Sequence, residues 1–166
     1  MTAGSPGAVA AGHRDRPEPS VGWQVEVLDR QPGQAGVIRR SGHVYVRVVD
    51  GAPAGSGGAT RSLLAADLAA DGSAHLVARC SPPALVLSDS GVRPLPAGGS
   101  GRATISLQRG DRLVMCSAAS LEGEPDGVVS LLRAGPGSAR RADLRWLVRT
   151  LLRGSDTGAA AVIRRT

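Results

Sequence analysis

Short runs in which apolar and polar residues alternate dominate the sequence from residue 43 onward. Val44, Val46 and Val48 are separated by a tyrosine and an arginine, and the same two-residue period recurs in residues 73–80 and 102–108. Successive side chains of a β-strand point to opposite faces, so this period predicts strands with one buried and one solvent-facing side. Such strands are typical of an antiparallel sheet that buries one face and exposes the other.

Turn residues separate these runs at short intervals. Asp71-Gly72 divides residues 59–68 from residues 73–80, and two alternating runs around an Asp-Gly pair predict a hairpin. Residues 59–68 also have the alanine and leucine content of a helix, but their alternation favours a strand. Residues 88–91 and 96–101 are expected to form a turn and a loop. Further strands are predicted at residues 23–28, 35–40, 43–50, 84–87, 102–108, 112–117 and 159–165.

One amphipathic helix is predicted near the C-terminus, at residues 138–153. Its leucines and valine, at positions 144, 147, 148, 151 and 152, follow the spacing of a single buried helix face. Gly154 is placed to end the helix. A shorter helix is expected at residues 125–133.

The composition limits how the core is built. The 166 residues include no Phe, one Tyr and two Trp, so burial depends on Val, Leu, Ile and Ala, which bury less area per residue than aromatic side chains. A thin core of modest stability follows. Residues 1–21 are small, rich in Pro and Gly and without periodicity, and are expected to be a disordered leader. Residues 22–166 are expected to form a single domain.

The two cysteines, Cys80 and Cys116, lie in strand-like runs and are expected to be buried. The sequence has no CxxC motif or Cys/His cluster, which argues against a zinc site. His43 and His75 are expected to be surface imidazoles. No long apolar run or signal-peptide pattern is present, so a cytoplasmic location without a membrane partner is expected.

Several short motifs occur in a recognisable order. They are Asp50-Gly51, Gly58-Ala59-Thr60, residues 75–87 with their Pro-Pro pair, residues 90–95, the Gly-Asp strand at residues 110–115, and Asp156 followed by residues 161–164. This order resembles the bacterial metal-dependent serine/threonine phosphatases of the protein phosphatase 2C-like class, in particular the stage II sporulation protein E type. The resemblance implies an α+β fold: a reduced, antiparallel two-sheet sandwich with one main C-terminal helix.

The resemblance also implies a metal site, and the sequence departs from it. Asp50, Gly51 and Asp156 match ligand positions of a family that uses two divalent cations to activate water and clamp a phosphate. Ala118-Ala119 stands where an Asp-Gly pair is expected, and Ser155 replaces an acidic neighbour of Asp156. No catalytic residue is assigned. No cofactor is expected; manganese or magnesium would be required if the chain were active.

A second departure concerns the helices of the family. Only residues 52–58 lie between the Asp-Gly loop and the Ala-Thr motif, too few for the two long helices that the family places there. Those helices cover one outer sheet face. That face is therefore expected to be polar or covered by another chain, which favours a homo-oligomer or an obligate subunit.

The charge is concentrated near the C-terminus. All twenty basic residues are arginine, and residues 138–166 carry seven Arg against two Asp, a net +5 of the chain's +6. Four of these arginines recur at every fourth residue: Arg141, Arg145, Arg149 and Arg153. On a helix this spacing makes one stripe. The stripe is consistent with a solvated face, with a docking surface for an acidic protein, or with phosphate contacts to nucleic acid.

Together these features predict a degenerate phosphatase-like module that binds a partner in bacterial regulation without catalysis. The partner is expected to be an acidic protein or a second copy of the chain. Two alternatives remain: a weak metal-dependent phosphoserine/phosphothreonine phosphatase, and a basic module that binds nucleic acid.

Overall fold

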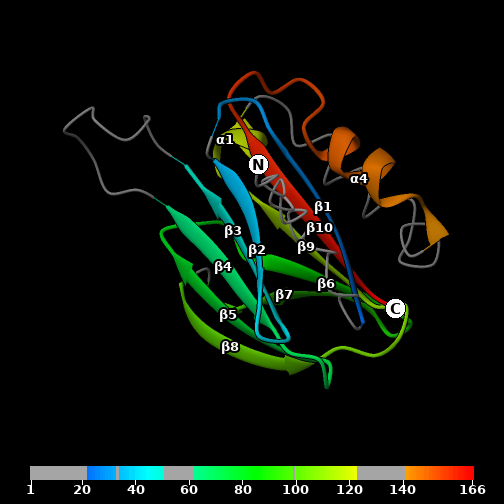
Figure 1. Ribbon diagram of the computed structural model, residues 1–166. Coiled ribbons are helices and arrows are strands. Elements are labelled where there is room, and N and C mark those ends of the chain that lie inside the picture. Colours follow the sequence, from blue (N-terminus) through cyan, green and yellow to red (C-terminus); the bar gives the residue numbers. More distant parts are fainter. Residues whose placement is uncertain (1–21, 33, 51–61, 99, 123–140) are drawn as a thin grey trace, which may run out of the picture.

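The computed structural model describes residues 22–32, 34–50, 62–98, 100–122 and 141–166. They form two five-stranded antiparallel sheets that lie face to face (Figure 1). Sheet I contains, in spatial order, β1 (Trp23–Asp29), β10 (Ala159–Arg165), β9 (Arg112–Cys116), β6 (Ala84–Ser88) and β7 (Gly91–Leu95). Sheet II contains β2 (Ala35–Arg40), β3 (His43–Val49), β4 (Leu63–Leu68), β5 (Ser73–Arg79) and β8 (Gly101–Ser106). The predicted α+β sandwich is confirmed.

The main core lies between the two sheets. Sheet II contributes the inward positions of its alternating strands, including Val46, Leu64 and Leu76. Leu113, Met115 and Ile163 contribute from sheet I, and all six of these side chains are buried. The alternation predicted from the sequence is confirmed in β3, where Val44, Val46 and Val48 are buried and the residues between them are exposed. Branched aliphatic side chains carry the core in the place of phenylalanine.

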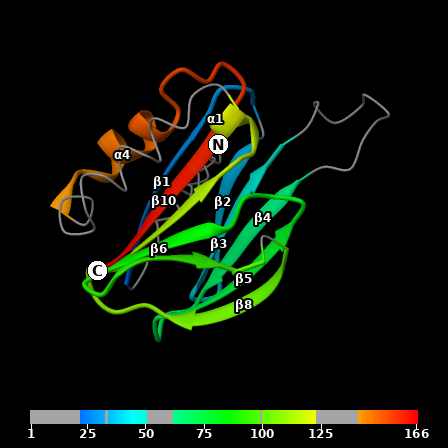
Figure 2. The same cartoon turned by 180° about the vertical axis from the view of Figure 1, so that it is seen from behind.

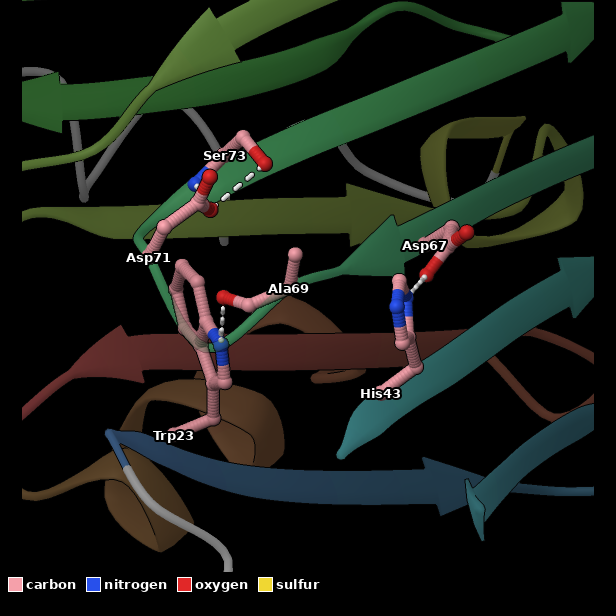
Figure 3. A network of polar contacts seen from close by, with 6 residues as sticks. All are labelled: Trp23, His43, Asp67, Ala69, Asp71 and Ser73. Atoms are coloured by element: carbon pink, nitrogen blue, oxygen red, sulfur yellow. Dashed lines mark hydrogen bonds and ion pairs between the residues drawn. The ribbon is translucent and has the colours of Figure 1, made fainter. Parts of the chain in front are cut away.

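The predicted hairpin at Asp71-Gly72 is also confirmed. β4 pairs antiparallel with β5, and Leu68 lies opposite Ala74. The Asp71 carboxylate accepts hydrogen bonds from Ser73 Oγ at 2.7 Å and from Ser73 N at 2.8 Å (Figure 3). These bonds stabilise the charged form and hold the pKa of Asp71 below its usual value.

Helix α4 (Leu144–Leu151) covers the outer face of sheet I (Figure 1). Its leucines and Val148 form a second core cluster with outward side chains of the sheet such as Val114 and Val162. The helix is shorter than residues 138–153, because Asp143 has an extended backbone and accepts a hydrogen bond from Trp146 N at 3.0 Å as the N-cap. Gly154 follows the C-terminus with φ +81°, as predicted.

Three local details differ from the prediction, and two predictions lie outside the described residues. The edge strand β7 (Gly91–Leu95) was not predicted; Pro94 is tolerated there because an edge strand has one unpaired side. The four-residue helix α1 (Ala119–Glu122) was also not predicted. Cys80 is exposed rather than buried, because it follows the end of β5 with φ +49°. The leader at residues 1–21 and the helix at residues 125–133 lie outside the described residues.

Trp23 connects the two sheets (Figure 3). Its indole Nε1 in β1 donates a 2.8 Å hydrogen bond to the carbonyl oxygen of Ala69, which follows β4 in sheet II. The guanidinium carbon of Arg165, opposite Trp23 in the β1–β10 register, lies 5.4 Å from the ring centroid. A Cβ at Gly72 would lie 1.9 Å from Arg165 Nη1. Gly72 has φ +98°, which favours glycine, and a side chain there would displace the Arg165 guanidinium from the ring.

The two outer faces of the sandwich differ. Figures 1 and 2 show α4 along the outer side of sheet I, with β4, β5 and β8 on the opposite side of the molecule. Among the described residues, no helix packs on the outer face of sheet II. No helix within the described ranges is long and apolar enough to cross a membrane.

Candidate functional site

Asp50, one of the residues predicted to hold metal, lies at the end of the sandwich where β3, β4 and β9 come together. Asp50 follows β3, and its backbone N donates to the carbonyl oxygen of Ser62 at 3.2 Å, just before β4. Ala118 follows β9, and Ala119 is the first residue of α1. The sheets thus bring Asp50 to the Ala-Ala pair across 68 residues of sequence.

The Asp50 carboxylate is occupied by hydrogen bonds from the protein. Oδ2 accepts from the backbone N of Ala118 and from Ser62 Oγ, the latter at 2.8 Å. Oδ1 accepts from the backbone N of Ala119 at 3.2 Å. Both oxygens are therefore held by donors, two of them the amides of the residues that stand where a second acid is expected. An aspartate in this arrangement stabilises a bend in the chain.

Buried hydroxyl groups fill the adjoining space. Ser120 Oγ donates to the Ser117 carbonyl at 2.6 Å, and Ser117 Oγ accepts from the backbone N of Ala159 at 3.0 Å. Ser155 Oγ donates to the Ala119 carbonyl at 3.3 Å and is buried. A Cβ at Gly158 would lie 2.6 Å from Ser155 Oγ. The site is closed by serine–backbone bonds and a tight glycine contact.

The arrangement does not fit a two-metal centre. Asp156 is exposed, and Gly51 lies outside the described residues. Asp29, another carboxylate of the described residues, accepts a 3.4 Å hydrogen bond from Ala35 N. No group of three or more His, Cys, Asp or Glu side chains in the described part of the chain is placed to hold a metal ion. A pair of hard cations needs several converging oxygen ligands, and here one carboxylate is already satisfied.

A cysteine nucleophile is also absent from this end of the sandwich, as far as the described residues extend. Cys116 is buried, and burial raises the pKa of its thiol to about 12, although a hydrogen bond with Ser120 acts in the opposite direction. A buried thiol of this kind is inert at neutral pH, because the thiolate is the reactive form.

Only two of the four arginines of the predicted stripe lie on α4. Arg145 and Arg149 lie on α4, whereas Arg141 precedes the Asp143 cap and Arg153 follows the end of the helix; all four are exposed. Arg145 Nε lies 3.9 Å from a carboxylate oxygen of Glu26. Sequence reasoning missed Trp146, whose side chain is 54% exposed beside these arginines. Its position off the apolar spacing of the helix was the available signal.

A polar cluster on sheet II was also missed. His43 Nδ1 lies 2.7 Å from Asp67 Oδ1 (Figure 3), and the His43 ring stacks on Tyr45 with centroids 5.9 Å apart. His75 is exposed, as predicted, and its Nδ1 lies 3.0 Å from Thr104 Oγ1. The alternation that places these residues on one outward face was visible in the sequence, but the cross-strand pairing was not.

No protein-family model matches the chain, and no curated protein matches it. Solved structures do. The phosphatase 2C domain of the cell-fate determinant SpoIIE from Bacillus subtilis, with a fragment of its regulatory domain, aligns with a TM-score of 0.63 over 86% of this chain and 63% of that chain, at 13% identity. The fold is protein phosphatase 2C-like.

Two further structures agree with this protein phosphatase 2C-like fold. The RsbU and RsbW domains of Rv1364c from Mycobacterium tuberculosis align with a TM-score of 0.62 and 14% identity, over 87% of this chain and 61% of that chain. The catalytic domain of the phosphatase PstP from the same organism, solved with two manganese ions, aligns with a TM-score of 0.55 and 12% identity, over 87% of this chain and 99% of that chain. The chain spans about three fifths of the SpoIIE and Rv1364c chains. At these identities the likeness establishes the fold alone.

Proposed function

We propose that the chain is a non-catalytic protein phosphatase 2C-like module that binds an acidic protein partner in a bacterial regulatory system. The non-catalytic part of this proposal is supported by the Asp50 carboxylate, which accepts hydrogen bonds from Ala118 N, Ala119 N and Ser62 Oγ. In a metal centre these oxygens would face the ions. Here they hold the chain segment that replaces a ligand.

The chemistry of a two-metal phosphatase supports this proposal. Such an enzyme must lower the pKa of a bridging water and clamp the phosphate that the water attacks. Losing an acid removes both negative charge and a coordination position. With alanines at positions 118 and 119 and a buried serine at 155, the nearby positions supply no replacement carboxylate. The alternative, a weak metal-dependent phosphatase, requires an ion to displace the amide donors from Asp50.

An assay of phosphoserine-peptide hydrolysis with manganese tests this part. We expect no turnover above a protein-free blank, and no heat of manganese binding in calorimetry, because Asp50 is already satisfied by hydrogen bonds. An active phosphatase of the same fold, assayed in parallel, is the positive control. Turnover by the wild-type chain that chelation abolishes and added manganese restores would overturn the non-catalytic proposal, whatever the behaviour of any variant.

The partner-binding half of the proposal is supported by the outer side of α4. Arg145, Arg149 and Arg153 are exposed there with the indole of Trp146. Tryptophan and arginine are the residues most enriched among those that dominate the free energy of protein–protein binding. A positive patch also steers an acidic partner toward the surface. An acidic protein surface with an apolar contact for Trp146 therefore fits this side of the molecule.

Binding of a labelled glutamate-rich peptide tests the α4 surface. We expect Arg145→Glu/Arg149→Glu to weaken binding at least about tenfold, since each reversal replaces attraction by repulsion. The control is Arg93→Glu, an exposed arginine on the edge strand β7. Equal weakening by the control would show that net charge alone acts and would contradict a defined surface. Tighter binding of a single-stranded oligonucleotide of equal charge would favour nucleic acid instead.

A further inference from the structure

The outer face of sheet II carries three of the four large hydrophobic residues that are exposed among the described residues. Four large hydrophobic side chains are exposed there and on α4: Ile38 at 64%, Tyr45 at 41%, Val77 at 38% and Trp146 at 54%. The first three come from β2, β3 and β5 and point away from the core. Scattered apolar residues are ordinary on a surface, but a grouped set marks an interaction site.

The register places these residues in two neighbouring rows across the sheet. Ile38 lies opposite Tyr45, so the first row has two large apolar side chains together. In the second row Arg47 lies opposite Ala65, Ala65 opposite Val77, and Val77 opposite Arg102. Three strand spacings separate the two arginine Cα positions, about 14 Å. The second row therefore has two apolar side chains, Ala65 and Val77, between two arginines.

Tyr45 is held in place on this face. His43 stacks on its ring with an interplanar angle of 16°, and His43 is itself fixed by the 2.7 Å contact with Asp67 (Figure 3). An aromatic side chain that is ordered before binding loses less conformational entropy when a partner arrives. This property separates the Tyr45 region from an ordinary exposed side chain.

The charges on the face select the kind of partner. Arg47, Arg79 and Arg102 are exposed on it, whereas Asp67 is engaged by His43. A second copy of the chain that packed by the same face would bring arginines against arginines, which disfavours binding. A segment with apolar side chains in its centre and carboxylates on its flanks would satisfy both parts of the surface.

We propose that the outer face of sheet II binds an acidic amphipathic segment of a partner protein, with Ile38, Tyr45 and Val77 as the apolar contact and Arg47 and Arg102 as the carboxylate contacts. This surface lies on the side of the sandwich opposite α4 (Figures 1 and 2). It extends the partner-binding half of the proposed function to a second, separate site. The module then joins two acidic partners, or two parts of one partner, across its thickness.

The test uses a labelled helical peptide with leucines on one face and glutamates on both flanks, and a matched peptide with lysines in place of the glutamates. We expect the acidic peptide to bind at least about tenfold more tightly. In NMR spectra, it should shift backbone amides of β3, β4 and β5, in addition to any shifts of the α4 amides. Arg47→Glu/Arg102→Glu and, separately, Val77→Glu should each weaken binding at least about tenfold, and Arg47→Lys/Arg102→Lys should retain most of it.

Arg145→Glu/Arg149→Glu on α4 is the matched control: it removes the α4 contribution, and the affinity read from the amide shifts of β3, β4 and β5 should stay within about twofold. Equal binding of the two peptides, no binding at millimolar concentration, or amide shifts confined to α4 would overturn the inference. Concentration-dependent dimers in light scattering that are lost in Val77→Glu would identify a second copy as the occupant and overturn it as well. Failure here leaves the glutamate-rich-peptide and hydrolysis experiments intact, so the proposed function is judged separately.

Discussion

Replacing Trp23 by alanine is expected to lower the free energy of unfolding by about 3–5 kcal/mol, the range measured for large-to-small changes of buried aromatic residues. Trp23 is 3% exposed and packs in the core cluster between the sheets. The substitution also removes the indole donor to the Ala69 carbonyl and the ring beneath Arg165. The Ala69 carbonyl and the Arg165 guanidinium would both lose a partner from the other strand or sheet, which adds to the cavity term.

Trp146→Ala is the matched control, because Trp146 is the second tryptophan and its side chain is 54% exposed. It should change stability by no more than about 0.5 kcal/mol. Urea unfolding followed by circular dichroism measures both variants, and the slope of the transition should stay unchanged. If Trp146→Ala destabilised the chain as much as Trp23→Ala, the assignment of Trp23 as the connection between the sheets would be wrong.

The size of this effect follows from the composition. With no phenylalanine in the chain, the core relies on side chains such as Val46, Leu64 and Ala66, each of which buries less area than an indole. Trp23 is the only buried aromatic side chain among the described residues. A single substitution therefore removes a large share of the apolar area that connects β1 to sheet II.

The strands were largely predictable because their information is local. The valines of β3 and the alternating residues of β5 reveal both the strand and its buried face without knowledge of the partners. Edges of elements were less predictable. The start of α4 depends on the Asp143 side chain capping Trp146 N, whereas the four-residue arginine spacing begins before that residue, at Arg141. β7 contains Pro94, and a proline in the sequence usually predicts a loop, although an edge strand tolerates it.

The site was predictable only in its composition. Ala118-Ala119 and Ser155 show from the sequence that expected acids are missing. The hydrogen bonds of the Asp50 carboxylate could not be predicted, because Asp50 and its amide partner Ala118 are 68 residues apart in the sequence and lie at the ends of different sheets. Long-range contacts of this kind leave no local pattern. The same limit applies to the His43–Asp67 pair, which depends on the register between β3 and β4.

Asp50→Ala is expected to lower the free energy of unfolding by about 2–4 kcal/mol, since hydrogen bonds to a charged group are each worth about 1.5–3 kcal/mol and neighbouring bonds do not add fully. The lost acceptor leaves Ala118 N, Ala119 N and Ser62 Oγ without their carboxylate partner. Asp50→Asn keeps one acceptor oxygen and should cost about half as much. Asp156→Ala removes the other aspartate that matches a ligand position, which is exposed. It should change the free energy of unfolding by no more than about 0.5 kcal/mol.

The sign of the Asp50 effect separates a structural role from a metal-binding one when unfolding is measured in a chelator. Acids gathered for a metal repel one another without it, so removing one would stabilise the metal-free protein. A carboxylate held by amide donors stabilises the fold by itself, and its loss destabilises the protein under the same conditions. Manganese should then leave the unfolding midpoint of the wild-type chain unchanged, because an ion that binds the native state would raise it. If Asp50→Ala were more stable than the wild-type chain in chelator, and manganese raised the unfolding midpoint of the wild-type chain, Asp50 would be assigned to a metal site instead.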